Sequence, residues 1–128
     1  MQKEIVSSDR APKAIGAYSQ AVMVEGARLV YISGQLGLDP AGGAMVPGGV
    51  VAETRQAMNN LGAILKTSGG DYSSIIKTTI YLADIADFAA VNEVYAGYFS
   101  ADFPARAAFA VAALPKGGRV EIEAVAAL

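Results

Sequence analysis

The stretch DFPARAAFAVAALP, residues 102–115, places a single cation, Arg106, directly before an unbroken apolar run, residues 107–114. The immediate flanks of this arginine, FPA and AAFAV, contain no acidic residue. A partly buried guanidinium requires an anion, and its planar fork fits a carboxylate in bidentate geometry. Two interpretations follow: Arg106 marks a strand end and extends into water, or it binds an anionic ligand.

Glu121 and Glu123 in RVEIEAVA are the second candidate group. By strand alternation they share one face with Arg119, while Val120 and Ile122 face the other way. The pair is either the wet polar side of an amphipathic strand, or it includes one glutamate that transfers a proton with water as its partner. The spacing alone does not choose between Glu121 and Glu123.

Three further segments hold weaker candidates. Tyr18 follows Gly16 in a turn-like stretch, Ser33 and Gly34 end a predicted strand where backbone N–H groups could approach a ligand, and Asn92 interrupts the apolar pattern of a predicted helix. Each also has an ordinary structural explanation. Packing explains the tyrosine, a turn explains the Ser-Gly pair, and helix-surface polarity explains the asparagine.

The residue types that are absent narrow the chemistry. With no Cys and no His in 128 residues, the chain has no disulfide framework, no thiolate nucleophile, no zinc site and no Ser–His triad. We therefore expect no metal and no cofactor. Catalysis must come from carboxylates, Arg, Lys, Tyr, hydroxyls, backbone groups and water.

Charge and hydropathy indicate an oligomer. Charged residues make up 17% of the chain, hydrophobic residues make up 53%, and the net charge is −2. So few charges predict that another subunit covers part of the surface. Lys and Arg are scattered singly, which argues against nucleic acid as a ligand. No stretch approaches the roughly 18 apolar residues of a membrane span, and the N-terminus lacks a signal-peptide core, so we expect a cytoplasmic protein, with an organellar fraction left open.

The pattern of elements predicts an α+β fold of order β-β-β-α-β-α-β-β. The runs at 20–24 and 28–34, separated by EGA, predict a hairpin, and a shorter strand is expected near residues 4–7. Helices are expected around 57–65, ended by Gly69 and Gly70, and around 91–99. The remaining strands are expected at 75–84, 105–113 and 119–127, the last two joined by a PKGG turn.

This order predicts a mixed β-sheet with two helices packed on one face. A helix that joins two strands by a crossover makes part of the sheet parallel. The run 107–113 is apolar on both alternating faces, so the second face of the sheet must also be buried. No third helix is available for that face, which again favours neighbouring subunits.

Taken together, five strings resemble the RidA/YjgF family of reactive-intermediate (2-iminobutanoate/2-iminopropanoate) deaminases, most of all its animal-type members. They are AIGAYSQAV, YISGQLGLDP, GGVVAETRQAMNNL, IIKTTIYLADIADFAAVNEVY and FPARAAFAVAALPKGGRVEIEAVA, in the family's order and spacing. The resemblance covers roughly residues 3–127. It implies a single RidA-like domain over residues 1–128, a fold similar to bacterial chorismate mutase, and a homotrimer with clefts between subunits.

The resemblance also implies a role for each matched residue. Arg106 matches the arginine that binds the substrate carboxylate, and Glu121 matches the glutamate that activates water. The positions that match the cleft lining, with the backbone beside Arg106, are Tyr18, Ser33, Gly34, Asn92 and Ala107. The implied reaction is cofactor-independent hydrolysis of 2-enamine/2-imino acids to 2-keto acids and ammonia.

Two other classes of function stay open at this point. Animal-type relatives have been described as endoribonucleases that inhibit translation, although the chain lacks His and a basic patch and has a pI near 5.0. Alternatively, the chain is a chaperone or a small-carboxylate-binding module whose cleft binds without turnover.

Overall fold

The computed structural model describes residues 1–128 and confirms the predicted order of elements. The strands and helices are β1 (Gln2–Val6), β2 (Ala21–Glu25), β3 (Leu29–Leu36), α1 (Val50–Ser68), β4 (Ile75–Leu82), α2 (Phe88–Ala96), β5 (Ala105–Ala110) and β6 (Val120–Ala127). Three short 3-10 helices precede β4, α2 and β6, at Tyr72–Ser74, Ile85–Asp87 and Pro115–Gly117. None of the helices is both long and apolar enough to span a bilayer.

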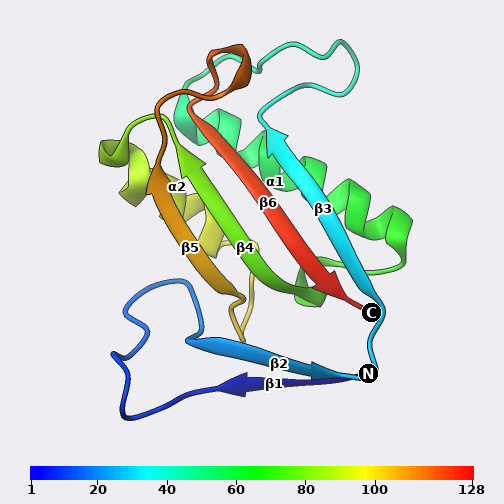
Figure 1. Ribbon diagram of the computed structural model, residues 1–128. Coiled ribbons are helices and arrows are strands. Elements are labelled where there is room, and N and C mark those ends of the chain that lie inside the picture. Colours follow the sequence, from blue (N-terminus) through cyan, green and yellow to red (C-terminus); the bar gives the residue numbers. More distant parts are fainter.

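The main sheet has four strands in the order β3-β6-β4-β5. Strand β6 runs antiparallel to both β3 and β4, and β4 runs parallel to β5. Both helices cover the same face of this sheet, and the other face carries no helix (Figure 1). The predicted α+β architecture, a mixed sheet with two helices on one face, is therefore confirmed.

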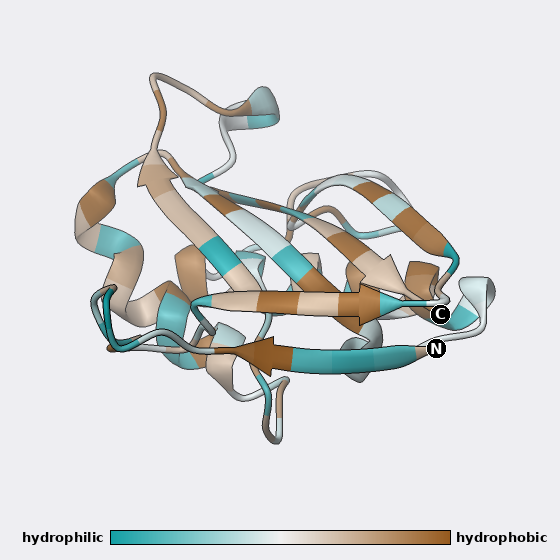
Figure 2. Ribbon diagram, turned by 60° about the horizontal axis from the view of Figure 1, so that its bottom comes forward, coloured by the Kyte–Doolittle hydropathy of each residue, from teal (hydrophilic) through white to brown (hydrophobic).

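The predicted hairpin between residues 20–24 and 28–34 is wrong. Strand β2 pairs with β1 in a separate two-stranded sheet, and β3 pairs with β6 instead. The chain changes direction at Gly26, whose φ is 66°, and Arg28 and Leu128 then exchange backbone hydrogen bonds of 2.8 and 2.9 Å. These bonds align the start of β3 with the end of β6, about 100 residues later in the chain. Figure 1 shows this two-stranded sheet apart from the main sheet, and in Figure 2 it lies in front of the main sheet.

The end of the chain also differs from expectation. The strand expected at 105–113 ends at Ala110, and β5 does not pair with β6, because β4 lies between them. The Pro115–Gly117 turn therefore connects two strands that are not neighbours. Local turn residues predict that the chain reverses, but they do not determine which strand lies beside which.

The core lies between the helices and the inner face of the sheet. The predicted stripe of α1 is buried at Ala57, Met58, Leu61 and Leu65, all at 0% exposure, and Gly69 ends this helix in the left-handed conformation. Along β6, residues 120 and 122 are fully buried while 121 and 123 are only partly covered. The alternation expected for β6 is thus confirmed.

One polar contact lies inside this core. The hydroxyls of Thr78 on β4 and Tyr95 on α2 are 2.8 Å apart, and both residues are 0% exposed. Each hydroxyl is thereby the other's partner in a region without water, where an unpaired hydroxyl is costly. The contact fixes α2 on the sheet directly behind the start of β5.

We expect Tyr95→Phe to destabilise the fold by about 1–3 kcal/mol, because Thr78 loses its partner. The double variant Tyr95→Phe with Thr78→Val should be clearly less destabilised than the sum of the two single variants, since both polar groups are then removed. Urea unfolding of the four proteins measures the difference. Strictly additive single effects would mean that the two hydroxyls do not depend on each other.

Candidate active site

Arg106 lies on β5, the edge strand of the main sheet, and its side chain is directed toward α2. In the sheet it is adjacent to Thr78. Its guanidinium carbon lies 5.2 Å from the ring centroid of Tyr95, 5.4 Å from that of Phe88 and 5.5 Å from that of Tyr18. Distances of this size allow cation–π attraction, so three aromatic rings surround the cation.

Asn92 supplies the polar contact to this cation. Its side-chain oxygen accepts a hydrogen bond of 2.6 Å from Nη1 of Arg106. The residue lies one helical turn after Phe88 on α2, so both side chains reach the same guanidinium. The polar interruption of this helix therefore faces Arg106 rather than open solvent.

No carboxylate of the chain neutralises Arg106. The one ion pair in the structure joins Arg119 to Asp87, and the single hydrogen bond from the Arg106 side chain goes to a neutral amide. Burial lowers the pKa of the Arg106 guanidinium, as expected for a cation partly removed from water. An anionic ligand would supply the missing counter-charge, and the free N–H groups of the guanidinium can donate hydrogen bonds to a carboxylate.

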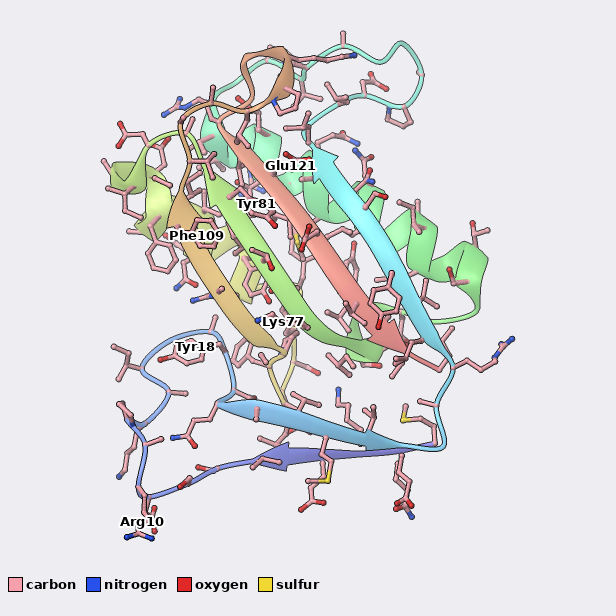
Figure 3. The ribbon with its side chains drawn as sticks, viewed as in Figure 1. Arg10, Tyr18, Lys77, Tyr81, Phe109 and Glu121 are labelled. Carbon is pink, nitrogen blue, oxygen red and sulfur yellow. The ribbon has the colours of Figure 1, made fainter.

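Tyr18 reaches this cation from the loop between β1 and β2. Ser19 anchors the loop, because its backbone N–H donates to Pro104 O at 3.1 Å and its hydroxyl donates to Phe103 O. The Tyr18 hydroxyl accepts a 3.4 Å hydrogen bond from Ile15 N. The loop therefore holds the Tyr18 ring beside the start of β5 (Figure 3).

Glu121 lies on β6 and leans over Gly34. A β-carbon added at Gly34 would overlap the Glu121 carboxylate and lie 2.8 Å from its Cδ. The register between β3 and β6 shifts between Ile32 and Gln35, which places Ser33 and Gly34 in a β-bulge. The prediction that these two residues end a strand is wrong, since β3 continues to Leu36. The close contact at the bulge nevertheless explains why residue 34 is a glycine, because a side chain there would displace Glu121.

The structure does not bring Arg106 and Glu121 together. Arg106 is level with Thr78 of β4, while Glu121 is opposite Tyr81, three residues further along the same strand. An odd offset reverses the side-chain direction, so Arg106 faces the helices and Glu121 faces the uncovered side of the sheet. Figure 3 shows Glu121 and Tyr18 near opposite ends of the sheet. No groove of the single chain is lined by either Arg106 or Glu121.

The predicted site residues therefore lie in two separate groups, which we call half-sites. The arginine half-site contains Arg106, Asn92 and Tyr18, and the glutamate half-site contains Glu121, Gly34 and the exposed Ser33. Ala107 follows Arg106 on β5 and is half-buried. Strand β5 is an edge strand and pairs only with β4. Glu123 is opposite Thr79 on the same face as Glu121.

Two aromatic residues beside Arg106, Phe88 and Tyr95, were not predicted from the sequence as site residues. Together with Asn92 these residues stand at positions i, i+4 and i+7 of α2 and so share one helical face. That spacing was readable from the sequence. The contact between this helical face and Arg106 could not be predicted, because it depends on the parallel pairing of β4 and β5.

Fold and half-sites together define an α+β protein with an unneutralised arginine at a sheet edge and a glutamate on the uncovered sheet face. Residues 8–128 match the model of the family described as Endoribonuclease L-PSP. The chain is 62% identical over 124 residues to the 2-iminobutanoate/2-iminopropanoate deaminase of Capra hircus, which covers 97% of this chain and 89% of the relative. The chain therefore belongs to the RidA/YjgF family, as the sequence motifs predicted.

Two solved structures are similar over nearly the whole chain. RidA from the Antarctic bacterium Psychrobacter sp. PAMC 21119 has a TM-score of 0.76 at 45% identity, covering 98% of this chain and 99% of that one. TdcF of E. coli with bound serine has a TM-score of 0.75 at 38% identity, covering 98% of each chain.

The arginine half-site makes a direct prediction about anion binding. Asn92→Asp places a carboxylate against Arg106, so the affinity for a small 2-oxo acid such as pyruvate should fall by about tenfold or more. Asn59→Asp, on the exposed side of α1, adds the same charge elsewhere and should leave the affinity within about twofold. Calorimetric titration measures both. Unchanged affinity in Asn92→Asp would mean that anions do not bind at Arg106.

Proposed function

We propose that this protein is a deaminase that hydrolyses 2-imino acids, such as 2-iminobutanoate and 2-iminopropanoate, to 2-keto acids and ammonia. The observation that carries the proposal is the half-buried Arg106, which has no carboxylate partner in its own chain. The similarity to the Capra hircus deaminase supports the same reaction. Such substrates carry the carboxylate that the arginine lacks.

The proposed mechanism uses the two half-sites in sequence. Arg106 binds the carboxylate through its unoccupied N–H groups, with Asn92 and the aromatic rings fixing the orientation of the guanidinium. Tyr18, Ser33, Gly34 and the backbone of Ala107 line the substrate position in this proposal.

Glu121 acts on water at the other half of the site. It takes a proton from a water molecule as the oxygen forms a bond to the C=N carbon, which is electrophilic because it is an iminium beside a carboxylate. The glutamate then returns that proton to the nitrogen of the tetrahedral intermediate. As the C–N bond breaks, the hydroxyl group of the intermediate passes its proton to the Glu121 carboxylate and becomes the C=O of the 2-keto acid. The departing ammonia takes up that proton and leaves as ammonium, so that one water is consumed for each iminium.

We further propose that the site forms between subunits of a homotrimer. Within one chain Arg106 and Glu121 face opposite sides of the sheet, so a second copy must supply one of them. The uncovered face also exposes large apolar side chains, namely Tyr31 at 76%, Leu29 at 48% and Phe109 at 45%. A head-to-tail contact that closes as a ring covers this face and brings a neighbour's β5 edge to Glu121.

The test of the reaction generates 2-iminobutanoate from threonine with a dehydratase and follows imine loss with and without this protein. We expect the wild type to accelerate the loss. Arg106→Ala should lower kcat/KM by about 100-fold or more, and Glu121→Gln should lower kcat by about 100-fold to 10,000-fold.

Matched controls are available for both variants. Arg10→Ala removes an exposed arginine of the loop between β1 and β2, and Glu25→Gln changes an exposed glutamate at the end of β2. Both controls should keep wild-type kinetics. If the wild type binds 2-keto acids without accelerating imine loss, the chain is a binding module. If the purified protein degrades RNA and a half-site variant does not, the nuclease hypothesis replaces the deaminase hypothesis.

The intersubunit site predicts that two inactive variants complement each other. When Arg106→Ala and Glu121→Gln chains exchange subunits in equal amounts, about one quarter of the sites should combine an intact arginine with an intact glutamate. Imine hydrolysis should therefore recover to about that fraction. Light scattering on the same samples reports the mass. A single-chain mass, or mixed assemblies with no recovered activity, would contradict the shared site.

A further inference from the structure

Arg119 connects three elements at the point where β6 begins. Its backbone N–H donates a 2.9 Å hydrogen bond to the Glu53 carboxylate of α1. Its guanidinium donates to both carboxylate oxygens of Asp87, with Nη2 at 2.9 and 3.0 Å. Its carbonyl oxygen accepts from Ala83 N at 3.0 Å, just after β4. The residue stands two positions before Glu121.

Glu53 is placed to hold the beginning of β6. It lies in the first turn of α1, is 5% exposed, and its carboxylate contacts a backbone group rather than a cation. A carboxylate that accepts a backbone N–H makes a strong, charge-assisted bond. This bond fixes the Arg119 backbone, and with it the strand that carries Glu121.

Asp87 is placed to hold the beginning of α2. It occupies the N-cap position of that helix, yet its side chain makes no capping hydrogen bond and binds Arg119 instead. The next residue is Phe88, whose ring contacts the Arg106 guanidinium, and Asn92 follows one turn later. The position of α2 against β6 therefore sets the two groups that orient Arg106.

We propose that Arg119, with Glu53 and Asp87, is a positioning residue that holds both half-sites in register. The inference rests on the proposed deaminase. The Arg119 side chain is 47% exposed and that of Asp87 is 16% exposed, so water screens the pair in part and its contribution to global stability is modest. Reaction rates are far more sensitive to position, since a displacement of about 1 Å can cost about 100-fold.

The contacts assign separate kinetic effects to the two carboxylates. Glu53→Ala frees the start of β6, so kcat should fall by about tenfold with KM little changed. Glu53→Gln keeps an oxygen acceptor for Arg119 N and should restore most of kcat. Asp87→Ala loosens Phe88 and Asn92 around Arg106, so KM should rise by about tenfold.

A control variant and measurements of folding distinguish a loss of positioning from a loss of the folded state. Asp39→Ala removes an exposed carboxylate that accepts a hydrogen bond from Ala41 N in the loop after β3, away from Arg119 and α2, and it should keep wild-type kinetics. Asp87→Ala combined with Arg119→Ala should be no worse than either single variant if the pair acts as a unit. Thermal unfolding and light scattering confirm that each variant is folded and assembled.

Where an alanine variant fails to fold, the milder variants Glu53→Gln and Asp87→Asn are measured instead. Of these two, only Asp87→Asn should raise KM.

Two outcomes overturn the positioning role. Folded Glu53→Ala and Asp87→Ala proteins with kcat and KM within about twofold of wild type would do so, as would equal loss of activity in Glu53→Gln and Glu53→Ala. Failure of the proposed function is recognised separately, because the wild type would then not hydrolyse the imine at all. In that case the affinity for 2-oxobutanoate still tests Asp87, since its removal should weaken binding at Arg106.

Discussion

The guanidinium of Arg106 is partly removed from water and has no carboxylate in its own chain to balance its charge. Arg106 is stabilised by three aromatic rings and one amide oxygen, which attract a cation without neutralising it. A carboxylate in place of Asn92 would give a more stable cation and a closed site. With the neutral Asn92 at this position, the proposed function leaves the arginine available for an external anion.

The surrounding elements can be understood as the support for that arginine. Helix α2 presents Phe88, Asn92 and Tyr95 on one face, and the buried hydroxyl contact between Tyr95 and Thr78 fixes that face against the sheet. Burial raises the pKa of Tyr95, opposed by its bond to Thr78 and by the charge of Arg106. A rigid aromatic surface behind a cation reduces the ordering that must occur when a ligand binds.

Sheet alternation separates Arg106 from Glu121 within one chain. Because Arg106 and Glu121 are separated by an odd number of strand positions, neither twist nor side-chain rotation can bring them to the same face. The same alternation leaves an apolar face uncovered at Tyr31 and Phe109. In the proposed trimer, the association that buries this face also completes the site, so stability and activity would depend on the same contact.

The sequence by itself determined the local features. Helical spacing and strand alternation identified α1, α2 and the two faces of β6, the absence of His and Cys limited the chemistry, and the motifs around Arg106 and Glu121 identified the family. Which strands are neighbours became visible only in the folded chain. It placed β4 between β5 and β6 and separated β2 from β3, contrary to the hairpin that the residues between them favoured. It also gave Phe88 and Arg119 their positions beside the half-sites. The physical reason is that periodicity is a property of adjacent residues, whereas strand order and side-chain contacts arise from long-range packing that no short segment encodes.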